Sequence, residues 1–378
     1  MISVLAGSFV ISGLICFGLI LFKHVHQKFS SDHVGSGPQK MHHGATPRIG
    51  GLPIFLGLLV GMTILYFSER KLNGFPFVVA ILPVWLAGMI EDLTKKVSPL
   101  KRLLAAFVAA LIAVWLLDAK IARLGVPFLD HFLNSCVIVN VLFVMFAVGG
   151  VTHAMNIIDG FNGLAGVVVV MILSALAYVS YQVRDTFLLG QCIALIGATV
   201  GFLCWNYPRG AIFAGDGGAY LWGFVIAEIS VMLVYRNPKV SPWFPLLLVI
   251  YPVWETIFSI YRRKILRGKP AGLPDAIHLH SLVYKRLVRY MVGSKLAEHM
   301  IRRNALTAPY LWCLAAFSII PAILFWSNTP IIWLFCVLFI LCYCTFYAMI
   351  VRFKIKRWMT VGSDAELRAG NSKVESSV

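Results

Sequence analysis

Five polar segments interrupt an otherwise strongly apolar chain, and the carboxylates in them could support chemistry on a phosphorylated compound. Glu91 and Asp92 are adjacent in GMIEDL, Asp159 lies in NIIDGFNGL, and Asp216 lies in the glycine-rich run GDGG. An acid on a glycine-rich turn suits an Mg²⁺ ion that bridges to phosphate, because Mg²⁺ takes few protein carboxylates and completes its shell with water and phosphate oxygens. These four residues are therefore our candidates for the metal ligand and the catalytic base.

The segment AMNIIDGFNGLAG, residues 154–166, adds two amides to this set. Asn156 and Asp159 are three residues apart, so they would lie on one face of a helix, and Asn162 follows closely. Gly160 and Gly163 permit either a broken helix or close helix packing. A packing patch with an incidental acid is the alternative, but we favour a functional role for the two asparagines and the aspartate.

Basic residues stand next to the acids. Arg48 precedes paired glycines in TPRIGG, where a helix N-terminus could face an anion, although a Pro-Arg pair is also an ordinary start for a membrane helix. Lys101 and Arg102 follow Glu91 and Asp92 closely and could either pair with them or attract phosphate.

The longest polar loop, residues 262–307, carries Arg263, His278 and His280. Histidines at positions i and i+2 do not share a helical face, so we expect an extended or turn conformation there. A zinc site would need further ligands, and no cysteine is close. Histidine in the company of arginine more often contacts phosphate, while the cations also fit the ordinary excess of positive charge on the cytoplasmic side.

The elements that position these residues are predicted to be membrane helices. Hydrophobic residues make up 59% of the 378 residues and charged residues only 13%, and the mean hydropathy is +0.82. Eleven apolar runs are long enough to cross a hydrocarbon core. They lie near 3–22, 49–67, 75–92, 103–118, 135–153, 164–183, 186–205, 218–235, 243–261, 308–326 and 329–351. We read the first as a retained helix and not a signal peptide.

The distribution of Lys and Arg predicts the orientation of this all-α membrane protein. With the N-terminus in the periplasm and the C-terminus in the cytoplasm, the cytoplasmic loops and tail would carry 26 of the 33 basic residues. The net charge of +17 then faces anionic lipids and metabolites, and nucleic acid is not needed to explain it. All eight cysteines fall inside apolar runs and read as packing residues.

We therefore predict one polytopic domain, residues 1–351, followed by a polar and disordered cytoplasmic tail, residues 352–378. The polar segments fall near 40–51, 88–102, 153–164, 206–218 and 262–307, all on one membrane face. Acids and cations together fit a Mg²⁺-dependent reaction on a phosphorylated substrate, with a lipid as the second substrate. The alternatives are a secondary transporter of an anionic metabolite and a non-catalytic polyprenyl-phosphate binder.

These motifs resemble those of the polyprenyl-phosphate N-acetylhexosamine-1-phosphate transferases. That family includes bacterial enzymes that start O-antigen, enterobacterial common antigen, teichoic acid and peptidoglycan lipid intermediates. The resemblance covers about residues 40–290 and keeps the order of the family's motifs, which are PRIGG at 47–51, GMIEDL at 88–93, NIIDGFNGL at 156–164, NYPRGAIFAGDGG at 206–218 and PDAIHLH at 274–280.

The resemblance implies transfer of a sugar 1-phosphate from a UDP-N-acetylhexosamine to undecaprenyl phosphate, with release of UMP, in the bacterial inner membrane. It implies that Asp216 binds Mg²⁺, or Mn²⁺ in its place, and that Asp92 deprotonates or positions the lipid phosphate. Asn156 and Asp159 would belong to the nucleotide and metal neighbourhood. The active site would face the cytoplasm, and the oligomeric state is left open, a homodimer included.

The same resemblance makes His278 and His280 part of a diphosphate-binding loop. This sequence departs from the family pattern in two places. An Asp-Asp pair is usual where Glu91-Asp92 stands, and a His-x-His-His run is usual where Ser281 ends HLHS. We expect a specialised enzyme of the O-antigen type with an unusual sugar donor, which differs from the peptidoglycan enzyme.

Overall fold

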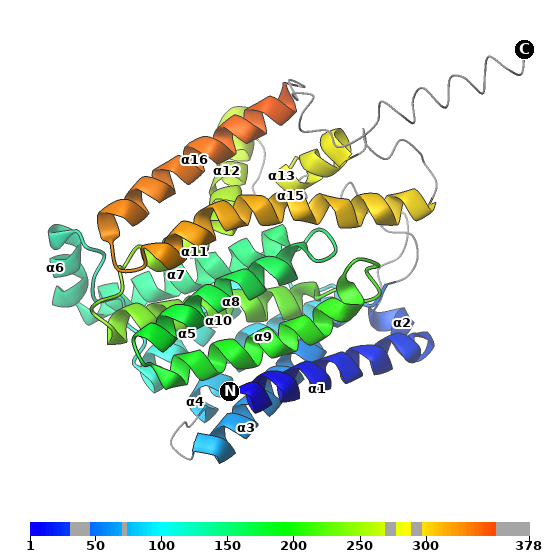
Figure 1. The fold of residues 1–378 in the computed structure, drawn as a ribbon, viewed down its shortest axis with the longest axis horizontal. Coiled ribbons are helices and arrows are strands. Elements are labelled where there is room, and N and C mark those ends of the chain that lie inside the picture. The colour runs from blue at the N-terminus through cyan, green and yellow to red at the C-terminus, as the bar shows by residue number, and fades with distance from the viewer. Residues whose placement is uncertain (31–45, 70–73, 269–276, 289–296, 353–378) are drawn as a thin grey trace, which may run out of the picture.

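The computed structural model describes residues 1–30, 46–69, 74–268, 277–288 and 297–352, and throughout these ranges the elements are helices (Figure 1). The predicted all-α fold is confirmed. The tail from residue 353, and parts of the loops predicted near 40–51 and 262–307, lie outside the described residues. We describe below the helices that position the polar segments.

Ten of the described helices are long and apolar enough to cross a membrane, and the chain is a multi-pass membrane protein. They are α1 (Ile2–Leu21), α3 (Gly51–Glu69), α4 (Phe75–Thr94), α5 (Pro99–Leu117), α7 (Val137–Ile158), α8 (Leu164–Gln182), α9 (Thr186–Asn206), α10 (Gly215–Arg236), α15 (Ala297–Leu324) and α16 (Thr329–Val351). Each falls on one of the predicted apolar runs.

The ninth predicted run, 243–261, differs from the prediction of one continuous span. It is divided at Val249 into α11 (Phe244–Leu248) and α12 (Ile250–Arg267). Pro252 explains the break, because it has no amide hydrogen with which to continue the ladder of α11. The end of α12 is also strongly basic, with Arg262, Arg263 and Lys264 in succession, and this helix runs across the direction of the other long helices (Figure 1).

Shorter helices lie at the ends of the bundle. They are α2 (Lys23–Ser30), α6 (Pro127–Ser135), α13 (Leu279–Leu282) and the π-helical segment η1 (Val283–Val288). Figure 1 shows α6 at one end of the bundle, and α2 and α13 toward the other. Because successive long helices run in opposite directions, the C-terminal ends of α4, α7 and α9 lie at the same end as the N-terminal ends of α3, α5, α8 and α10.

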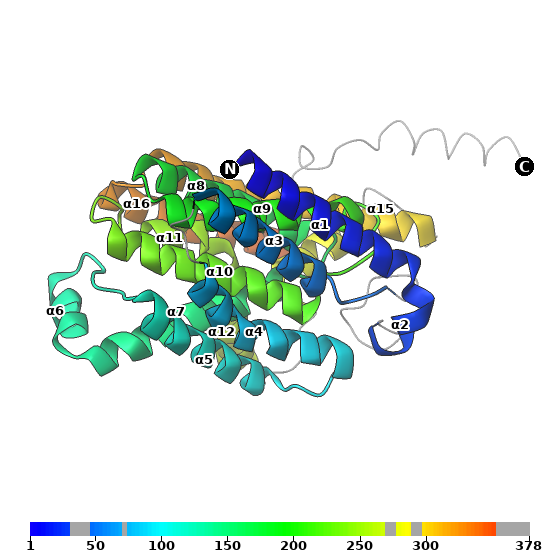
Figure 2. The same ribbon diagram turned by 90° about the horizontal axis from the view of Figure 1, so that it is seen from below.

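Helix α10 forms the centre of the core. Every residue from Gly215 to Val234 is buried, and the helix contacts α3, α4, α7, α8 and α9. Seen from below, it lies between α3, α8 and α9 on one side and α4, α5 and α7 on the other (Figure 2). A helix that is apolar on all faces is expected in this position, so the first turn of α10 brings Asp216 to the middle of one end of the bundle.

Glycines allow three helices to meet at the start of α10. A Cβ atom on Gly51 of α3 would lie 2.5 Å from the amide nitrogen of Gly218, and one on Gly88 of α4 would lie 2.7 Å from the Cα atom of Gly217. Neither position has room for a larger side chain. The glycines of the polar segments near 40–51, 88–102 and 206–218 therefore allow the backbones of α3, α4 and α10 to pack directly against one another.

Candidate active site

Asp92, near the C-terminal end of α4, caps the N-terminus of α10. Its Oδ1 atom accepts a hydrogen bond from the amide of Asp216, and its Oδ2 atom accepts one from the amide of Gly217, each at 2.8 Å. The first amides of a helix have no partner within the helix, so a carboxylate there satisfies two of them and also opposes the positive end of the helix dipole. The side chain is completely buried.

Gly215 makes this cap fit. Its φ angle is +68°, a conformation that side-chain-bearing residues rarely adopt. A Cβ atom here would overlap the carbonyl oxygen of Arg48 and both carboxylate oxygens of Asp92. The glycine before Asp216 is thus required by both its conformation and its surroundings.

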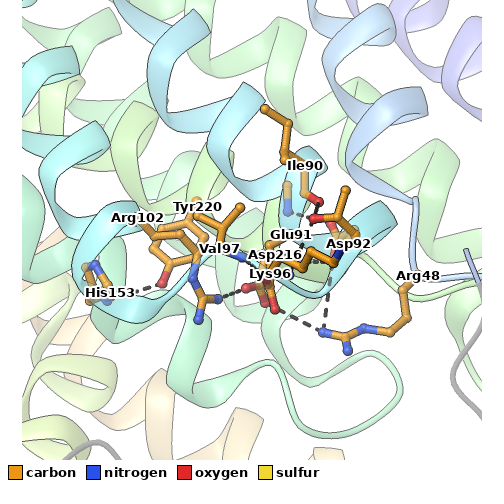
Figure 3. Close-up of polar contacts among 12 residues, drawn as sticks. Arg48, Ile90, Glu91, Asp92, Lys96, Val97, Arg102, His153, Asp216 and Tyr220 are labelled. Atoms are coloured by element: carbon orange, nitrogen blue, oxygen red, sulfur yellow. Dashed lines mark hydrogen bonds and ion pairs between the residues drawn. The ribbon is translucent and has the colours of Figure 1, made fainter. Parts of the chain in front are cut away.

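Two arginines hold the carboxylate of Asp216 (Figure 3). The guanidinium of Arg102, in the first turns of α5, forms a direct ion pair with Oδ2. The guanidinium of Arg48 lies 3.6 Å from Oδ1 and 3.9 Å from Oδ1 of Asp92. The polar segments near 40–51, 88–102 and 206–218 therefore meet at the carboxylate of Asp216. This is expected for segments predicted to lie on one membrane face.

Arg102 lies against Tyr220, and Tyr220 contacts His153, two residues that sequence reasoning missed. The guanidinium carbon of Arg102 lies 5.5 Å from the centre of the Tyr220 ring, and the Tyr220 hydroxyl lies 3.2 Å from Nδ1 of His153. The spacing could have revealed both residues. Tyr220 is one helical turn after Asp216, and His153 is three residues before Asn156 on α7.

Glu91 has a different role from that of its neighbour. Its Oε2 atom accepts a hydrogen bond of 2.6 Å from the amide of Val97, which fixes the turn between α4 and α5. Lys95 in that turn has a φ angle of +55° and donates its amide to the carbonyl of Glu91. Of the two adjacent carboxylates, Asp92 supports α10 and Glu91 supports the turn that leads to Arg102. Lys101 is exposed at the start of α5.

Asp159 follows the last residue of α7 and lies near Asp92 and Arg48. Loss of surrounding water raises the pKa of its carboxyl group to about 7, although the positive charge of Arg48 acts in the opposite direction. Its side chain is only half-buried by the protein, so a substrate or an ion can reach it. Asn156, on the preceding turn, lies within hydrogen-bonding reach of the Tyr220 hydroxyl. The structure therefore brings Asn156, Asp159 and Asp216 into one neighbourhood.

Asn162 belongs to a network that shapes the loop after α7. Its backbone amide donates a hydrogen bond to Oδ1 of Asn304 at 2.9 Å, and its side-chain Nδ2 atom donates one to the carbonyl of Pro208 at 3.0 Å. The side-chain Oδ1 atom of Asn206 accepts a hydrogen bond from the backbone amide of Gly163 at 2.7 Å. Asn162 thus joins its own loop to helix α15 and to the loop between α9 and α10. Asn206 and Asn304 were not predicted, although asparagine at the end of an apolar run was a usable signal.

The histidine segment lies against the loop of Asp159. The rings of His278 and His280 are stacked, with centres 5.2 Å apart. His280 contacts the ring of Phe161, and a Cβ atom on Gly160 would lie 3.0 Å from its Nε2 atom. His278 has an extended backbone and precedes α13, which contains His280. As predicted, the two histidines therefore do not lie on one helix.

Glu255 of α12 fastens the histidine segment. Its Oε1 atom accepts a hydrogen bond from the backbone amide of Leu279 at 3.2 Å. The same oxygen lies 2.9 Å from Nδ1 of His278, with which it is hydrogen-bonded. The other oxygen accepts the hydroxyl hydrogen of Tyr343 at 2.7 Å. The side chain is completely buried. This carboxylate therefore positions a candidate phosphate-binding segment.

The neighbouring arginines of α12 have separate environments. Arg262 is buried and donates to the carbonyl of Ile277 at 2.7 Å and to the hydroxyl of Tyr347 at 2.5 Å. It therefore attaches the beginning of the histidine segment to α16. Arg263 is half-buried on the same helix.

The donor atoms at the site suit a hard divalent cation. Asp216 and Asp159 offer carboxylate oxygens, which are the ligands that Mg²⁺ and Mn²⁺ accept. The described part of the chain contains no group of three or more metal-ligating side chains, so a cation here would take its remaining ligands from water and substrate. That coordination is the usual one for Mg²⁺ bound with phosphates and does not suit a structural zinc ion.

Comparisons with known proteins identify a family to which the chain is similar. Residues 75–234, which contain Asp92, Asp159 and Asp216, match the family model described as glycosyl transferase family 4. The chain is 30% identical over 64% of its length to a probable undecaprenyl-phosphate N-acetylglucosaminyl 1-phosphate transferase from Bacillus subtilis, and it spans 66%, about two thirds, of that relative.

Two further relatives show the range of the similarity. An undecaprenyl-phosphate alpha-N-acetylglucosaminyl 1-phosphate transferase from Thermotoga maritima is 28% identical over 67% of this chain and 72% of its own length. A phospho-N-acetylmuramoyl-pentapeptide-transferase from Clostridium perfringens is 27% identical over 60% of this chain and 73% of its own length. The relatives therefore include transferases with two kinds of named sugar.

Proposed function

Because the chain belongs to glycosyl transferase family 4, we propose that it transfers an N-acetylhexosamine 1-phosphate from a UDP-sugar to undecaprenyl phosphate. The products are undecaprenyl-diphosphate-sugar and UMP. The observation that carries this proposal is the convergence of Asp92, Asp159 and Asp216 with two arginines at one end of a membrane-helix bundle. Carboxylates for a cation and guanidiniums for a diphosphate are the groups that phosphoryl transfer needs.

The reaction exchanges one bond to phosphorus for another. An oxygen of the lipid phosphate attacks the β-phosphorus of the UDP-sugar, and the bond from that phosphorus to the bridging oxygen breaks, so UMP leaves with that oxygen. Asp216 would hold Mg²⁺ or Mn²⁺, which would neutralise charge on the phosphates, with Asp159 nearby. Arg48 and Arg102 lie beside the same carboxylates, where they can bind the diphosphate.

The structure supports different roles for the acids. Both oxygens of Asp92 already accept backbone hydrogen bonds, so we assign it the positioning of Asp216. Asp159 is reachable and has a pKa of about 7, and we assign it the removal of a proton from the lipid phosphate. With Asp92 engaged in this way, direct transfer in one step is favoured over a covalent aspartyl phosphate.

The proposal includes location and pathway. We place the chain in the bacterial inner membrane with the site facing the cytoplasm, because 26 of the 33 basic residues would then lie on that side. A lipid substrate explains why the site lies at the end of membrane helices. The reaction would be the first membrane step of O-antigen or a related surface polysaccharide. The family assignment makes a transporter or a non-catalytic lipid binder the weaker alternatives.

The test is a reconstituted reaction with a matched pair of variants. Protein purified in detergent is incubated with undecaprenyl phosphate, Mg²⁺ and a panel of UDP-N-acetylhexosamines and UDP-N-acetylmuramoyl-pentapeptide, and UMP release is followed. Asp216→Ala is expected to abolish release. Asp118→Ala is the control, because Asp118 is an exposed acid beyond the other end of α5, paired with Lys120.

UMP release that requires the lipid, the metal and Asp216 would establish the reaction and identify the sugar. If the folded protein bound the lipid but released UMP from none of these donors, the proposal would be wrong. Uptake of anionic metabolites into vesicles that contain the protein would be the next assay.

A further inference from the structure

Arg102 and Asp216 are held together by more than their opposite charges. Asp216 and Tyr220 are four residues apart on α10 and therefore lie on one face of that helix. Arg102 reaches this face from α5, with one end of its guanidinium on Oδ2 of Asp216 and its centre 5.5 Å from the Tyr220 ring. His153 contacts the Tyr220 hydroxyl at 3.2 Å (Figure 3).

Each carboxylate oxygen of Asp216 lies next to an arginine guanidinium. Arg102 contacts Oδ2 directly, and the guanidinium of Arg48 lies 3.6 Å from Oδ1. The Arg102 and Asp216 side chains are only 12% and 9% exposed, so solvent screens this pair weakly. A metal ion that binds Asp216 would therefore compete with these guanidiniums, and most directly with Arg102.

Arg102 has a reason to move when a phosphate compound is present. Its Nε atom is buried and has no hydrogen-bond partner, so the pair with Asp216 uses only part of the guanidinium's donors. A diphosphate offers oxygens to several donors at once, which favours arginine over a single carboxylate contact. Arg48 is the weaker counter-ion of Asp216, because its guanidinium lies 3.6 Å from Oδ1 and is shared with Asp92.

We propose that Arg102 is an exchangeable counter-ion of Asp216. Without nucleotide, Arg102 neutralises the carboxylate and weakens its affinity for the metal. When a nucleoside diphosphate binds, Arg102 transfers to its phosphates, and Asp216 becomes available to the metal. This inference rests on the proposed function only in taking Asp216 as the metal ligand.

A coupling between metal and nucleotide follows from this exchange. Either ligand alone must break the pair of Arg102 with Asp216, whereas the two together replace both partners. Each should therefore strengthen the binding of the other, and by linkage the factor is the same in both directions. Tyr220 is a positioning residue in this scheme, since its ring keeps the guanidinium beside the carboxylate.

The experiment measures metal binding without turnover. Mn²⁺ is titrated into the purified protein, and free Mn²⁺ is followed by electron paramagnetic resonance, with Arg102→Gln compared with wild type. Removing the counter-ion is expected to raise the affinity for Mn²⁺ alone roughly tenfold, as for loss of a competing charged hydrogen bond. UDP binding in the presence of a chelator is expected to weaken by about the same factor.

Lys96→Gln is the matched control. Lys96 is an exposed cation of the turn between α4 and α5, so its removal changes the net charge equally without freeing Asp216. It is expected to change both affinities by less than about twofold. If Arg102→Gln does not fold, Tyr220→Leu replaces it and is expected to raise Mn²⁺ affinity by a smaller factor.

The outcomes separate this inference from the proposed function. If Mn²⁺ binding depends on Asp216, as judged with Asp216→Asn, but Arg102→Gln binds Mn²⁺ no better than Lys96→Gln, the exchange is wrong and the metal site stands. If Asp216→Asn binds Mn²⁺ as tightly as wild type, with and without UDP, both the metal site and the exchange are wrong.

Discussion

The carboxylate of Asp92 accepts the backbone hydrogen of Asp216 at 2.8 Å, so one acid of the site is held in place by the other. This relationship predicts that two similar substitutions act on different parts of the site. Asp92→Asn replaces an acceptor with an amide that cannot satisfy both backbone donors, and is expected to lower the free energy of unfolding by about 1–3 kcal/mol and reduce UMP release at least 100-fold.

Asp216→Asn should abolish UMP release. It keeps the backbone hydrogen bond to Asp92, so any loss of stability should come from the unpaired guanidinium of Arg102 and not from the helix cap. Thermal unfolding in detergent and UMP release are to be measured on both variants. Wild-type unfolding temperatures and near-normal activity for Asp92→Asn would contradict the capping role.

Gly215→Ala is expected to destabilise the protein and to displace Arg48 or Asp92. Gly268→Ala separates backbone strain from crowding, because Gly268 has a φ angle of +60° and nothing within 4 Å of a Cβ atom. The control should cost about 1 kcal/mol, the usual penalty for a left-handed residue, and Gly215→Ala should cost clearly more. Equal unfolding temperatures for the two variants would show that the surroundings of Gly215 relax freely.

The raised pKa of Asp159, about 7, predicts a pH-dependent effect on stability. An ordinary aspartate has a pKa near 4 when unfolded, so between about pH 4 and pH 7 the folded protein keeps a proton that the unfolded chain has lost. Ionisation of Asp159 therefore destabilises the fold, with no effect below this window and the full effect above it.

Asp159→Asn should accordingly gain stability relative to wild type between pH 5 and pH 8, when divalent metal is absent. We expect about 1 kcal/mol after allowance for partial solvent screening, which is a shift of a few degrees. Asp118→Asn is the control. Hydrogen bonding to Lys120 lowers the pKa of Asp118, so its difference from wild type should not change in this range. A constant difference for Asp159→Asn would contradict the raised pKa.

Glu255→Gln is expected to loosen the histidine segment. The carboxylate holds His278 and the amide of Leu279 through one oxygen, so we expect faster hydrogen exchange in residues 277–288. If the segment binds the donor diphosphate, the KM for the donor should rise about tenfold with a smaller change in kcat, as for loss of a charged hydrogen bond.

Tyr343→Phe removes only the hydrogen bond to the other oxygen of Glu255 and should have a weaker effect on both measurements. Unchanged exchange and KM in Glu255→Gln would show that Glu255 does not position the segment.

Much of the architecture was predictable because apolar length alone determines it. Ten predicted runs became membrane helices, and alternation of their directions placed Arg48, Asp92, Asp159 and Asp216 at one end. The break at Val249 was not predicted, because a count of apolar residues does not consider that Pro252 lacks an amide hydrogen.

The individual roles within the site were less accessible from sequence. Adjacent acids such as Glu91 and Asp92 look equivalent in a motif, but only tertiary structure decides which one meets the free amides of α10 and which one closes a turn. Glu255 shows the same limit. It bonds to His278 and Tyr343, which come near it only when α12, α13 and α16 pack together.

The burial of α10 on every side has a consequence for how the bilayer acts on this protein. A bilayer around the bundle would touch the surrounding helices and not the buried length of α10. The thickness and fluidity of the membrane would therefore act on the Asp216 carboxylate only through those packed helices, even though the proposed acceptor substrate is itself a membrane lipid.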